Sequence, residues 1–380
     1  MASLQMSRAK PTRKKPTAVK AKVKKHDRIS VDLRKRILAG EFTGQVPGQR
    51  VLADHYGVNF LTVRRAVATL VKEGLLVREP GRGTFVTRLK RERTHTIAAV
   101  FGGLSFGLGG QHAALLQGIQ EEAARDHYDL ILRPHHGEAQ VEKQVIEEIL
   151  KREKVDGVLL WPTRDQSRSK AISLLKQANL PFVVMVRVDT EFHEEVSYVI
   201  DDVYKGGYDA TKHLISLGHR KIGYLARTSS EGAGEWFEEE RWRGFRQAQI
   251  DAKIEPGPRL QADWIINSSR TNKAVPLKFL EELRNITALF CMNDYMALAF
   301  LNLQKALGLH IPENMSVVGY DDIEAADLMG LTTMKMPMRD IGVEAMRCLL
   351  DEIEHPRTVP IRKVLEARLI ERTTTIRQKS

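Results

Sequence analysis

The chain has 380 residues and 42% hydrophobic content, enough for two or three domains with sizeable cores. The sequence lacks both a run of about 18 apolar residues and the apolar core of an export signal, so we expect a cytoplasmic protein without membrane contact. Residues 1–28 contain ten Lys and Arg and one acidic residue, Asp27, which gives a net charge of +9. Residues 29–91 contain twelve Lys and Arg and five Asp and Glu, which gives +7. Because the whole chain carries +11, the remaining residues carry −5. A basic front on an acidic body predicts that only the front binds phosphate.

The first 27 residues are rich in Lys, Pro and Ala and cannot bury enough apolar surface to fold alone, so we predict a disordered basic arm. A transit peptide is the alternative, but the segment is Lys-rich and lacks amphipathic periodicity. Cys291 and Cys348 lie among apolar neighbours and are predicted to be buried thiols in a reducing compartment. Because no Cys/His cluster has the spacing of a metal site, we expect no metal and no cofactor.

Residues 28–88 carry the pattern of a winged helix-turn-helix domain, a small α+β fold that binds DNA. Helices are predicted over Arg28–Ala39, Gln49–Tyr56 and Phe60–Lys72, with Gly57 permitting the turn and Asn59 capping the third helix. The third helix places apolar residues at helical spacing toward a core: Val63, Val67, Leu70 and Val71. Two short strands, LLVRE and GTFVT, are joined by a glycine-flanked tip and form the wing.

The predicted DNA contacts lie at the start of the second helix, at the start of the third helix and at the wing tip. Arg50 and Arg64 are expected to contact phosphate or guanine, Thr62 the DNA backbone, and Arg82 the minor groove. The complete predicted set is Arg50, Asn59, Phe60, Leu61, Thr62, Arg64, Arg65, Arg82 and Gly83. The alternative is a small helical domain whose arginines only solvate its surface.

This stretch, VPGQRVLADHYGVNFLTVRRAVATLVKEGLLVREPGRGTFV, resembles the DNA-binding domain of GntR-type bacterial regulators. Usual members have LPSERELA where this chain has VPGQRVLA, so Gly48 and Gln49 depart and Arg50 matches. Members also often open the recognition helix with Ser-Arg-Thr-Thr, whereas Asn59, Phe60 and Leu61 precede Thr62 here. The resemblance implies the same docking on DNA with different operator bases.

From Thr96 onward, short apolar runs alternate with amphipathic segments. The runs predicted as buried strands are TIAAVFGG, DLILRP, DGVLLWP, PFVVMV, SYVI, KIGYLA, ALFCMND and SVVGYDD. Strict alternation of strand and helix implies βαβ units and parallel sheets, and the number of units implies two Rossmann-like lobes. We therefore predict a linker over residues 89–95 and a two-lobed α/β domain over residues 96–376.

Polar or aromatic residues follow several of these strands, where ligands of open α/β sheets bind. They are Phe106, Arg187, Asp201 with Asp202, Asn293 with Asp294, and Asp321 with Asp322. Each alone is explained as a helix cap or turn residue, and Asp294 is a candidate cap of the helix that follows it. Together they suit a polyhydroxylated ligand, because each hydroxyl group both donates and accepts hydrogen bonds.

The blocks HLISLGHRKIGYL, ERWRGFRQA, CMNDYMALAF and IPENMSVVGYDDIEAADLMGLTTMKMP resemble the effector-binding domain of LacI/GalR-type repressors, which has a type I periplasmic-binding-protein-like fold. By position, Arg241, Asn293 and Asp321 match the family's principal effector contacts, and Asp201 and Phe106 match weaker ones. Met336 stands where many members carry a polar contact. A GntR-type reader on a LacI-type sensor also resembles the arabinose-repressor arrangement.

These features predict a ligand-responsive repressor that binds operator DNA as a homodimer and is controlled by a small molecule, a sugar. The alternatives are a non-sugar effector, an enzymatic second domain of the aminotransferase type, or a solute-binding protein. An enzyme needs a Schiff-base lysine in a phosphate-binding setting, and no GxSxG, HExxH or Walker motif occurs. His135, His136 and the acidic run Glu238–Glu240 are predicted to be surface residues.

Overall fold

The computed structural model describes residues 24–38, 41–42, 44–86, 93–102, 110–163, 169–227, 236–262, 264–265, 275–356 and 359–378. Most of the predicted basic arm and of the linker lies outside these residues, as does Phe106. The chain divides into two compact units, Met1–Leu89 and Lys90–Ser380.

The first unit is a winged helix-turn-helix. Its elements are α1 (Lys25–Leu38), β1 (Gln45–Val46), α2 (Gln49–Tyr56), α3 (Phe60–Lys72), β2 (Leu76–Glu79) and β3 (Gly83–Val86). The bounds of α2 and α3 agree with the prediction, and Gly57 makes the turn between them at φ 60°. Helix α3 presents its predicted apolar residues to a core shared with α1, and that core includes Leu33, Val63, Val67 and Leu70.

The wing has three antiparallel strands in the order β1-β3-β2, one more than predicted. Strand β1 is only two residues long, too short for its alternation to be read from the sequence. Its Gln45 pairs with Phe85, and the Gln45 side chain donates a hydrogen bond to the carbonyl of Arg82 at 2.7 Å. Strand β1, which is not part of the β2–β3 hairpin, therefore holds the wing tip in place.

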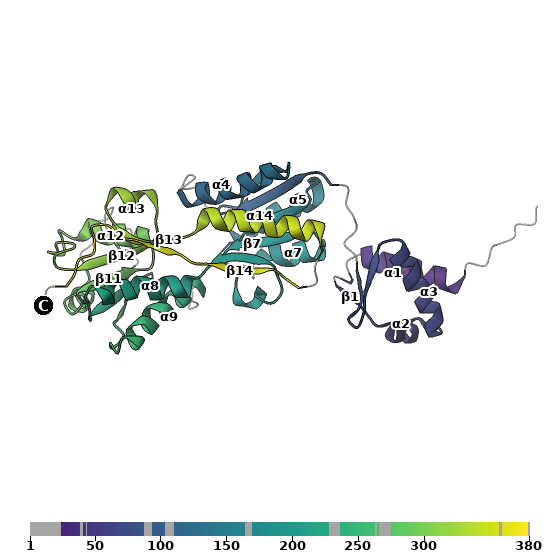
Figure 1. Ribbon diagram of the computed structural model, residues 1–380, viewed down its shortest axis with the longest axis horizontal. Coiled ribbons are helices and arrows are strands. Elements are labelled where there is room, and N and C mark those ends of the chain that lie inside the picture. Colours follow the sequence, from purple (N-terminus) through teal and green to yellow (C-terminus); the bar gives the residue numbers. More distant parts are fainter. Residues whose placement is uncertain are drawn as a thin grey trace, which may run out of the picture. The chain divides into compact units, whose positions relative to one another are not determined.

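The second unit has two lobes, each built on a six-stranded sheet (Figure 1). In the N-lobe the strand order is β14-β8-β7-β6-β4-β5, and all pairs are parallel. The N-lobe elements are β4 (Thr96–Phe101), α4 (Gly110–Arg125), β5 (Asp129–Pro134), α5 (Ala139–Arg152), β6 (Gly157–Trp161), α7 (Ala171–Gln177), β7 (Phe182–Val186), β8 (Tyr198–Asp201), α14 (Met338–Glu354) and β14 (Arg362–Leu365).

Both faces of the N-lobe sheet are buried, so its strands are apolar throughout rather than alternating. On β4, Ile97, Ala99 and Phe101 pack into the core beneath α4 and α14, whereas Ala98 and Val100 pack into the core beneath α5 and α7. Successive side chains of a strand point to opposite faces of the sheet, so alternate residues of β4 enter different cores.

The C-lobe sheet has the order β10-β9-β11-β12-β13-β15. Its elements are α8 (Val203–Ser216), β9 (Ile222–Ala226), α9 (Trp236–Asp251), β10 (Arg259–Gln261), α11 (Leu277–Leu283), β11 (Ala288–Cys291), α12 (Asp294–Leu303), β12 (Ser316–Asp321), α13 (Glu324–Leu328), β13 (Thr332–Lys335) and β15 (Arg368–Ile370). A short 3-10 helix, Thr190–Phe192, precedes β8 in the N-lobe.

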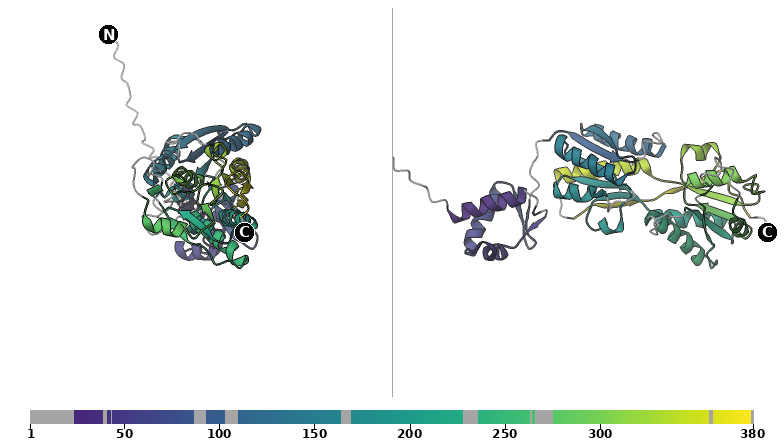
Figure 2. Two further views of the ribbon diagram at one scale, coloured as in Figure 1. Left: turned by 90° about the vertical axis from the view of Figure 1, so that its left-hand side faces the viewer. Right: turned by 180° about the vertical axis from the view of Figure 1, so that it is seen from behind.

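The chain passes between the lobes three times: from β8 to α8, from β13 to α14, and from β14 to β15 (Figures 1 and 2). The sheets are parallel, as predicted, except that after the third passage β15 joins the C-lobe sheet antiparallel to β13. Only Glu366 and Ala367 separate β14 from β15. The chain therefore runs straight on and enters the second sheet from the end where its other strands finish.

Each lobe contains a helix pair that crosses at glycines. A Cβ at Gly342 of α14 would lie within 3.0 Å of the Ile119 nitrogen of α4, and a Cβ at Gly118 of α4 would lie equally close to Val343 of α14. Helices α8 and α9 meet in the same way at Gly207 and Gly244. Each glycine permits backbone-to-backbone contact, so the two helices of each pair are closely packed.

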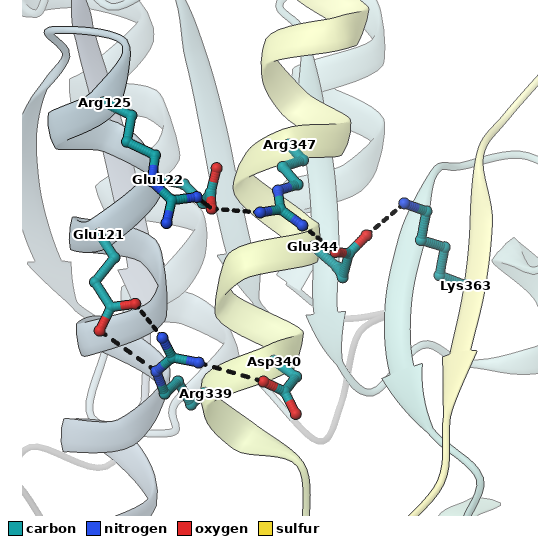
Figure 3. Close-up of polar contacts among 8 residues, drawn as sticks. All are labelled: Glu121, Glu122, Arg125, Arg339, Asp340, Glu344, Arg347 and Lys363. Atoms are coloured by element: carbon teal, nitrogen blue, oxygen red, sulfur yellow. Dashed lines mark hydrogen bonds and ion pairs between the residues drawn. The ribbon is translucent and has the colours of Figure 1, made fainter.

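Ion pairs extend the α4–α14 contact across the surface to β14 (Figure 3). Arg339 pairs with Glu121, and Arg347 pairs with Glu122 at 2.7 Å and Glu344 at 2.8 Å. These pairs line a concavity of ≈ 410 Å³ together with Arg125, Asp340, Val343 and Leu365. Most of the charged groups of this lining pair with one another.

Both cysteines, Cys291 and Cys348, are buried free thiols, as predicted. Among the residues that the structure describes, no helix is long and apolar enough to cross a membrane.

Candidate functional site

The carboxyl ends of β8 and β12 bring two predicted residues, Asp201 and Asp321, toward Arg241 of α9. The Arg241 side chain is 3% exposed, and its guanidinium lies 3.5 Å from the ring centroid of Tyr320. The Tyr320 hydroxyl donates to Asp201 at 2.9 Å, and Arg241 donates to the carbonyl of Met292. Tyr320 therefore joins the guanidinium of Arg241 to the carboxylate of Asp201. The sequence predicted the strand that contains Tyr320 but did not indicate this role.

Two buried polar atoms of this group lack a hydrogen-bond partner within the described part of the chain. They are Oδ1 of Asp201 and Nε of Arg241. Buried groups of this kind are normally satisfied by protein or ligand atoms, because an unmade bond costs about 1–3 kcal/mol. One free acceptor beside one free donor is the chemistry that a ligand hydroxyl group satisfies.

Burial also sets the protonation of the acidic groups. It raises the pKa of Asp201 to about 6, although the positive charge of Arg241 opposes the rise. Burial likewise raises the pKa of Asp321 to about 6, again against Arg241. Burial lowers the pKa of Arg241, but Tyr320, Tyr224 and the two carboxylates outweigh it and raise that pKa overall. The site therefore holds a permanent cation beside acids that titrate just below neutrality.

Aromatic rings and a second arginine stand beside this polar group. His112 of α4 stacks on Trp161 at the end of β6, with ring centroids 4.6 Å apart and planes at 20°. The guanidinium of Arg187 lies 5.9 Å from the Trp161 ring and 5.2 Å from that of Phe237, which also faces Arg241 at 6.0 Å. Burial lowers the pKa of His112, so its ring is neutral near pH 7. Apolar ring faces next to polar groups are typical of small-molecule sites.

The backbone is strained where these strands end. Val186, the last residue of β7, has φ 69°, and the amide of Arg187 donates to the carbonyl of Met185 at 2.7 Å. This is a γ-turn centred on Val186, and positive φ is sterically unfavourable for a β-branched residue. Asp321 and Asp322 also have positive φ, 119° and 57°. Strain of this kind gathers at functional sites, and here it sets the direction of Arg187 and Asp321.

A concavity of ≈ 520 Å³ opens between the start of α4 and the ends of β12 and β13. The side chain of Gln111 spans the two lobes by donating to the carbonyl of Asp321 at 3.4 Å. The other lining residues include Gly110, Ala114, Asp322, Ile323, Glu324, Asp327, Lys335, Met336, Met338 and Arg372. Met336 thus lies beside Asp321, at the position where a polar contact was expected from related sequences.

Asn293 and Asp294 each use a side-chain oxygen to hold the backbone around the site. The Asn293 side chain caps α12 by accepting from the amide of Met296 at 2.9 Å, a task that the sequence assigned to Asp294. Asp294 is fully buried and accepts from the amide of Ile323 at 2.9 Å and the hydroxyl of Thr333 at 2.6 Å. Burial raises the pKa of Asp294 to about 7. Its carboxylate thereby holds the loop that carries Asp321.

The prediction that His135 and Glu238 lie on the surface is wrong, since they are only 1% and 4% exposed. A His135 ring nitrogen lies 3.0 Å from the Trp161 carbonyl and 3.3 Å from Glu142, and the other ring nitrogen accepts from Gly137. Burial lowers the pKa of His135 and raises that of Glu142 to about 7. Polar composition suggested exposure, but this network instead supports the strand end that carries Trp161.

In the first unit, α2 and α3 expose arginines for which the described residues supply no acidic partner. Arg50, Arg64 and Arg65 are exposed, and within the described residues no ion pair engages them. By contrast, Arg34 of α1 pairs with Glu73 at 2.6 Å. Acidic partners are therefore present for Arg34 and Arg36 of α1, whereas the charges of Arg50, Arg64 and Arg65 remain available on α2 and α3. Thr62 of α3 is half-buried.

The cap and the wing fix the remaining predicted DNA contacts. Asn59 caps α3 by accepting from the amide of Leu61 at 2.8 Å, so Phe60 and Leu61 form the first turn. At the wing, Arg82 pairs with Glu79 at 2.6 Å and lies 5.8 Å from the Phe85 ring centroid. Gly83 has φ 130°, and a Cβ there would collide with the Gln45 side chain.

Two family models match the chain. The model of bacterial regulatory proteins of the gntR family matches residues 25–86. The model of a periplasmic binding protein-like domain matches residues 211–375.

Similar proteins include an arabinose metabolism transcriptional repressor of Halalkalibacterium halodurans, 28% identical over 88% of this chain and 90% of the relative. The HTH-type transcriptional repressor PurR of Aliivibrio fischeri is 32% identical over 65% of this chain and 73% of the relative. Among solved structures, the complex of the transcriptional regulator CelR with cellobiose is 25% identical, with a TM-score of 0.63, covering 87% of this chain and all of that one.

Proposed function

Since the chain belongs to the bacterial regulators that join a gntR-family reader to a periplasmic-binding-protein-like domain and is a ligand-responsive transcriptional repressor, we propose that its effector is a carbohydrate bound in the second unit. The observation that carries the proposal is the unsatisfied acceptor of Asp201 beside the unsatisfied donor of Arg241. A sugar hydroxyl group satisfies both atoms, and the neighbouring rings suit the apolar face of a sugar.

The relatives support this class of effector. One carries arabinose metabolism in its name, and the similar solved structure is a cellobiose complex. For this chain we assign Asp201, Arg241 and Asp321 as hydrogen-bonding residues and Arg187 as a flanking group. Asn293 and Asp294 position the site. Phe106 stays a predicted contact.

A thermal-shift screen with sugars in one arm and non-sugar metabolites in the other tests the effector class. A ligand at about 100 times its Kd adds roughly 2.7 kcal/mol to the unfolding free energy. Asp201→Asn should abolish the shift, whereas Asp129→Asn, an exposed carboxylate at the start of β5, should preserve it. A shift with non-sugar compounds alone would replace the carbohydrate with another metabolite.

We propose that the first unit binds double-stranded operator DNA through α3 in the major groove and Arg82 of the wing in the minor groove. Arg64→Ala should cost about 1–3 kcal/mol of binding free energy and relax sequence preference. Arg152→Ala, an exposed arginine on α5 of the other unit, is the matched control and should change neither. Unchanged affinity and preference in Arg64→Ala would contradict this placement of α3.

The proposal includes a homodimer on an inverted repeat, because a two-fold protein requires two half-sites. Leu328 and Met329 at the end of α13 are 81% and 50% exposed, and such apolar surface favours a partner. Sedimentation of the full chain checks the dimer. We further propose that residues 28–88 and 96–376 are the functional domains, that the protein acts in the cytoplasm where operator DNA lies, and that it has no catalytic role.

A further inference from the structure

Two large apolar side chains stand exposed at the start of α3. Phe60 is 39% exposed and Leu61 is 56% exposed. They are the first two residues of the helix, and the Asn59 cap holds them there through the Leu61 amide. Exposure of this kind costs free energy in the isolated unit, since fully burying one such side chain is favourable by about 1.5–3 kcal/mol.

The core of the unit does not need these residues. It is filled from α3 by Val63, Ala66, Val67 and Leu70, which are 0–1% exposed. Phe60 and Leu61 therefore lie outside the apolar stripe that faces α1, at the end of the helix that a helix-turn-helix directs at base edges.

The neighbouring charges indicate which partner covers them. Arg64 lies one helical turn from both Phe60 and Leu61, and Arg65 lies one turn from Leu61. Both arginines are exposed, and neither takes part in an ion pair with another described residue. A partner for this surface must combine negative charge with small apolar groups. The major groove does so, because the thymine C5-methyl group is its apolar feature.

We propose that Leu61 and Phe60 read thymine methyl groups in the major groove, so that each operator half-site carries thymine at the base pairs they contact. Arg64 then contacts the adjacent guanine or phosphate. This inference rests on the proposed DNA binding and adds the chemistry by which particular bases are chosen. Apolar side chains cannot hydrogen-bond to a base edge, so hydrophobic contact replaces hydrogen bonding at these positions.

The test uses the full chain and an operator selected from random duplex DNA at physiological salt. Each thymine is then replaced singly by deoxyuridine, which removes the methyl group and keeps every hydrogen-bonding group. Affinity should fall about fourfold at one or two thymines per half-site, which corresponds to ~0.8 kcal/mol for one buried carbon group. Substitution at other thymines should have no effect.

Alanine variants assign the contact to a residue. Leu61→Ala should bind more weakly than wild type and lose discrimination between thymine and deoxyuridine at one position, and Phe60→Ala should do so at another. Val31→Ala, which alters an exposed valine on α1, is the matched control and should keep full discrimination. Circular dichroism confirms that each variant is folded.

Equal binding of thymine and deoxyuridine operators by wild type overturns the inference while leaving the proposed function in place. Discrimination that survives in both Leu61→Ala and Phe60→Ala overturns it as well. If selection yields no preferred sequence, the proposed operator binding fails, and the inference fails with it.

Discussion

Gly342→Ala tests whether α4 and α14 cross in direct backbone contact. The new Cβ would lie 3.0 Å from the backbone nitrogen of Ile119 and closer still to the carbonyl oxygen of Leu115. Both atoms belong to the backbone of α4, so no flexible side chain can move aside. Helix α4 must instead shift away from α14, on which the N-lobe core depends.

Two opposing contributions set the magnitude. Alanine is favoured over glycine inside a helix by about 1 kcal/mol. Overpacking of a close-packed core costs typically 1–3 kcal/mol, and rigid backbone atoms place this site at the upper end. We expect net destabilisation of roughly 2 kcal/mol, or a fall of about 4 °C in the Tm of a domain of this size.

Differential scanning calorimetry of the full chain measures the effect on the transition of the second unit. Gly110→Ala is the matched control, because Gly110 is the first residue of α4 and a Cβ there would meet nothing within 4 Å. The control should keep or slightly raise the Tm. A Tm for Gly342→Ala at or above the wild-type value would refute the close crossing of α4 and α14.

Three further substitutions probe other parts of the account. In the folded wild type the pKa of Asp294 is raised from 3.8 to about 7, so the protein loses stability as the pH rises between about 4 and 7. Asp294→Asn removes this titrating group and should flatten the pH dependence of stability in that range. Denaturant titrations at several pH values measure the difference, and equal slopes would contradict it. Tyr320→Phe removes the hydroxyl that donates to Asp201 and should cost about 1–3 kcal/mol of stability together with effector affinity; calorimetry showing neither loss would count against this contact. Gln45→Ala frees the wing tip at Arg82 and should weaken operator binding without altering base preference at α3; unchanged affinity in an anisotropy titration would exclude a role for this bond.

Local patterns in the sequence predicted the elements of this fold well. Helical periodicity and the Gly57 turn located α2 and α3, and uninterrupted apolar runs located the interior strands of both lobes except β13. Strand β1, the interior strand β13 and the edge strands β10, β14 and β15 were missed. These strands are two to four residues long, too short to show a pattern of alternating apolar and polar residues. They form because they pair with neighbouring strands of the sheet.

The site was only partly predictable, because its chemistry depends on contacts between distant segments. Strand ends pointed to Asp201 and Asp321, whereas the resemblance to related sequences pointed to Arg241. Nothing local distinguished Tyr320 from any buried tyrosine of a strand, although it bonds Asp201 across 119 positions of sequence. The burial of His135 could not be predicted either, because its partner Glu142 lies on α5, a helix rich in charged residues.

The central claim is that effector bound in the second unit controls operator binding by the first. Operator affinity of the full chain, measured by fluorescence anisotropy with and without the effector identified in the thermal-shift screen, tests it most directly. We expect saturating effector to weaken operator binding, and operator DNA to weaken effector binding by the same factor, as thermodynamic linkage requires. Asp321→Asn should lose this response while keeping operator affinity. Operator affinity that does not change at saturating effector in the wild type, or a full response in Asp321→Asn, would contradict the account.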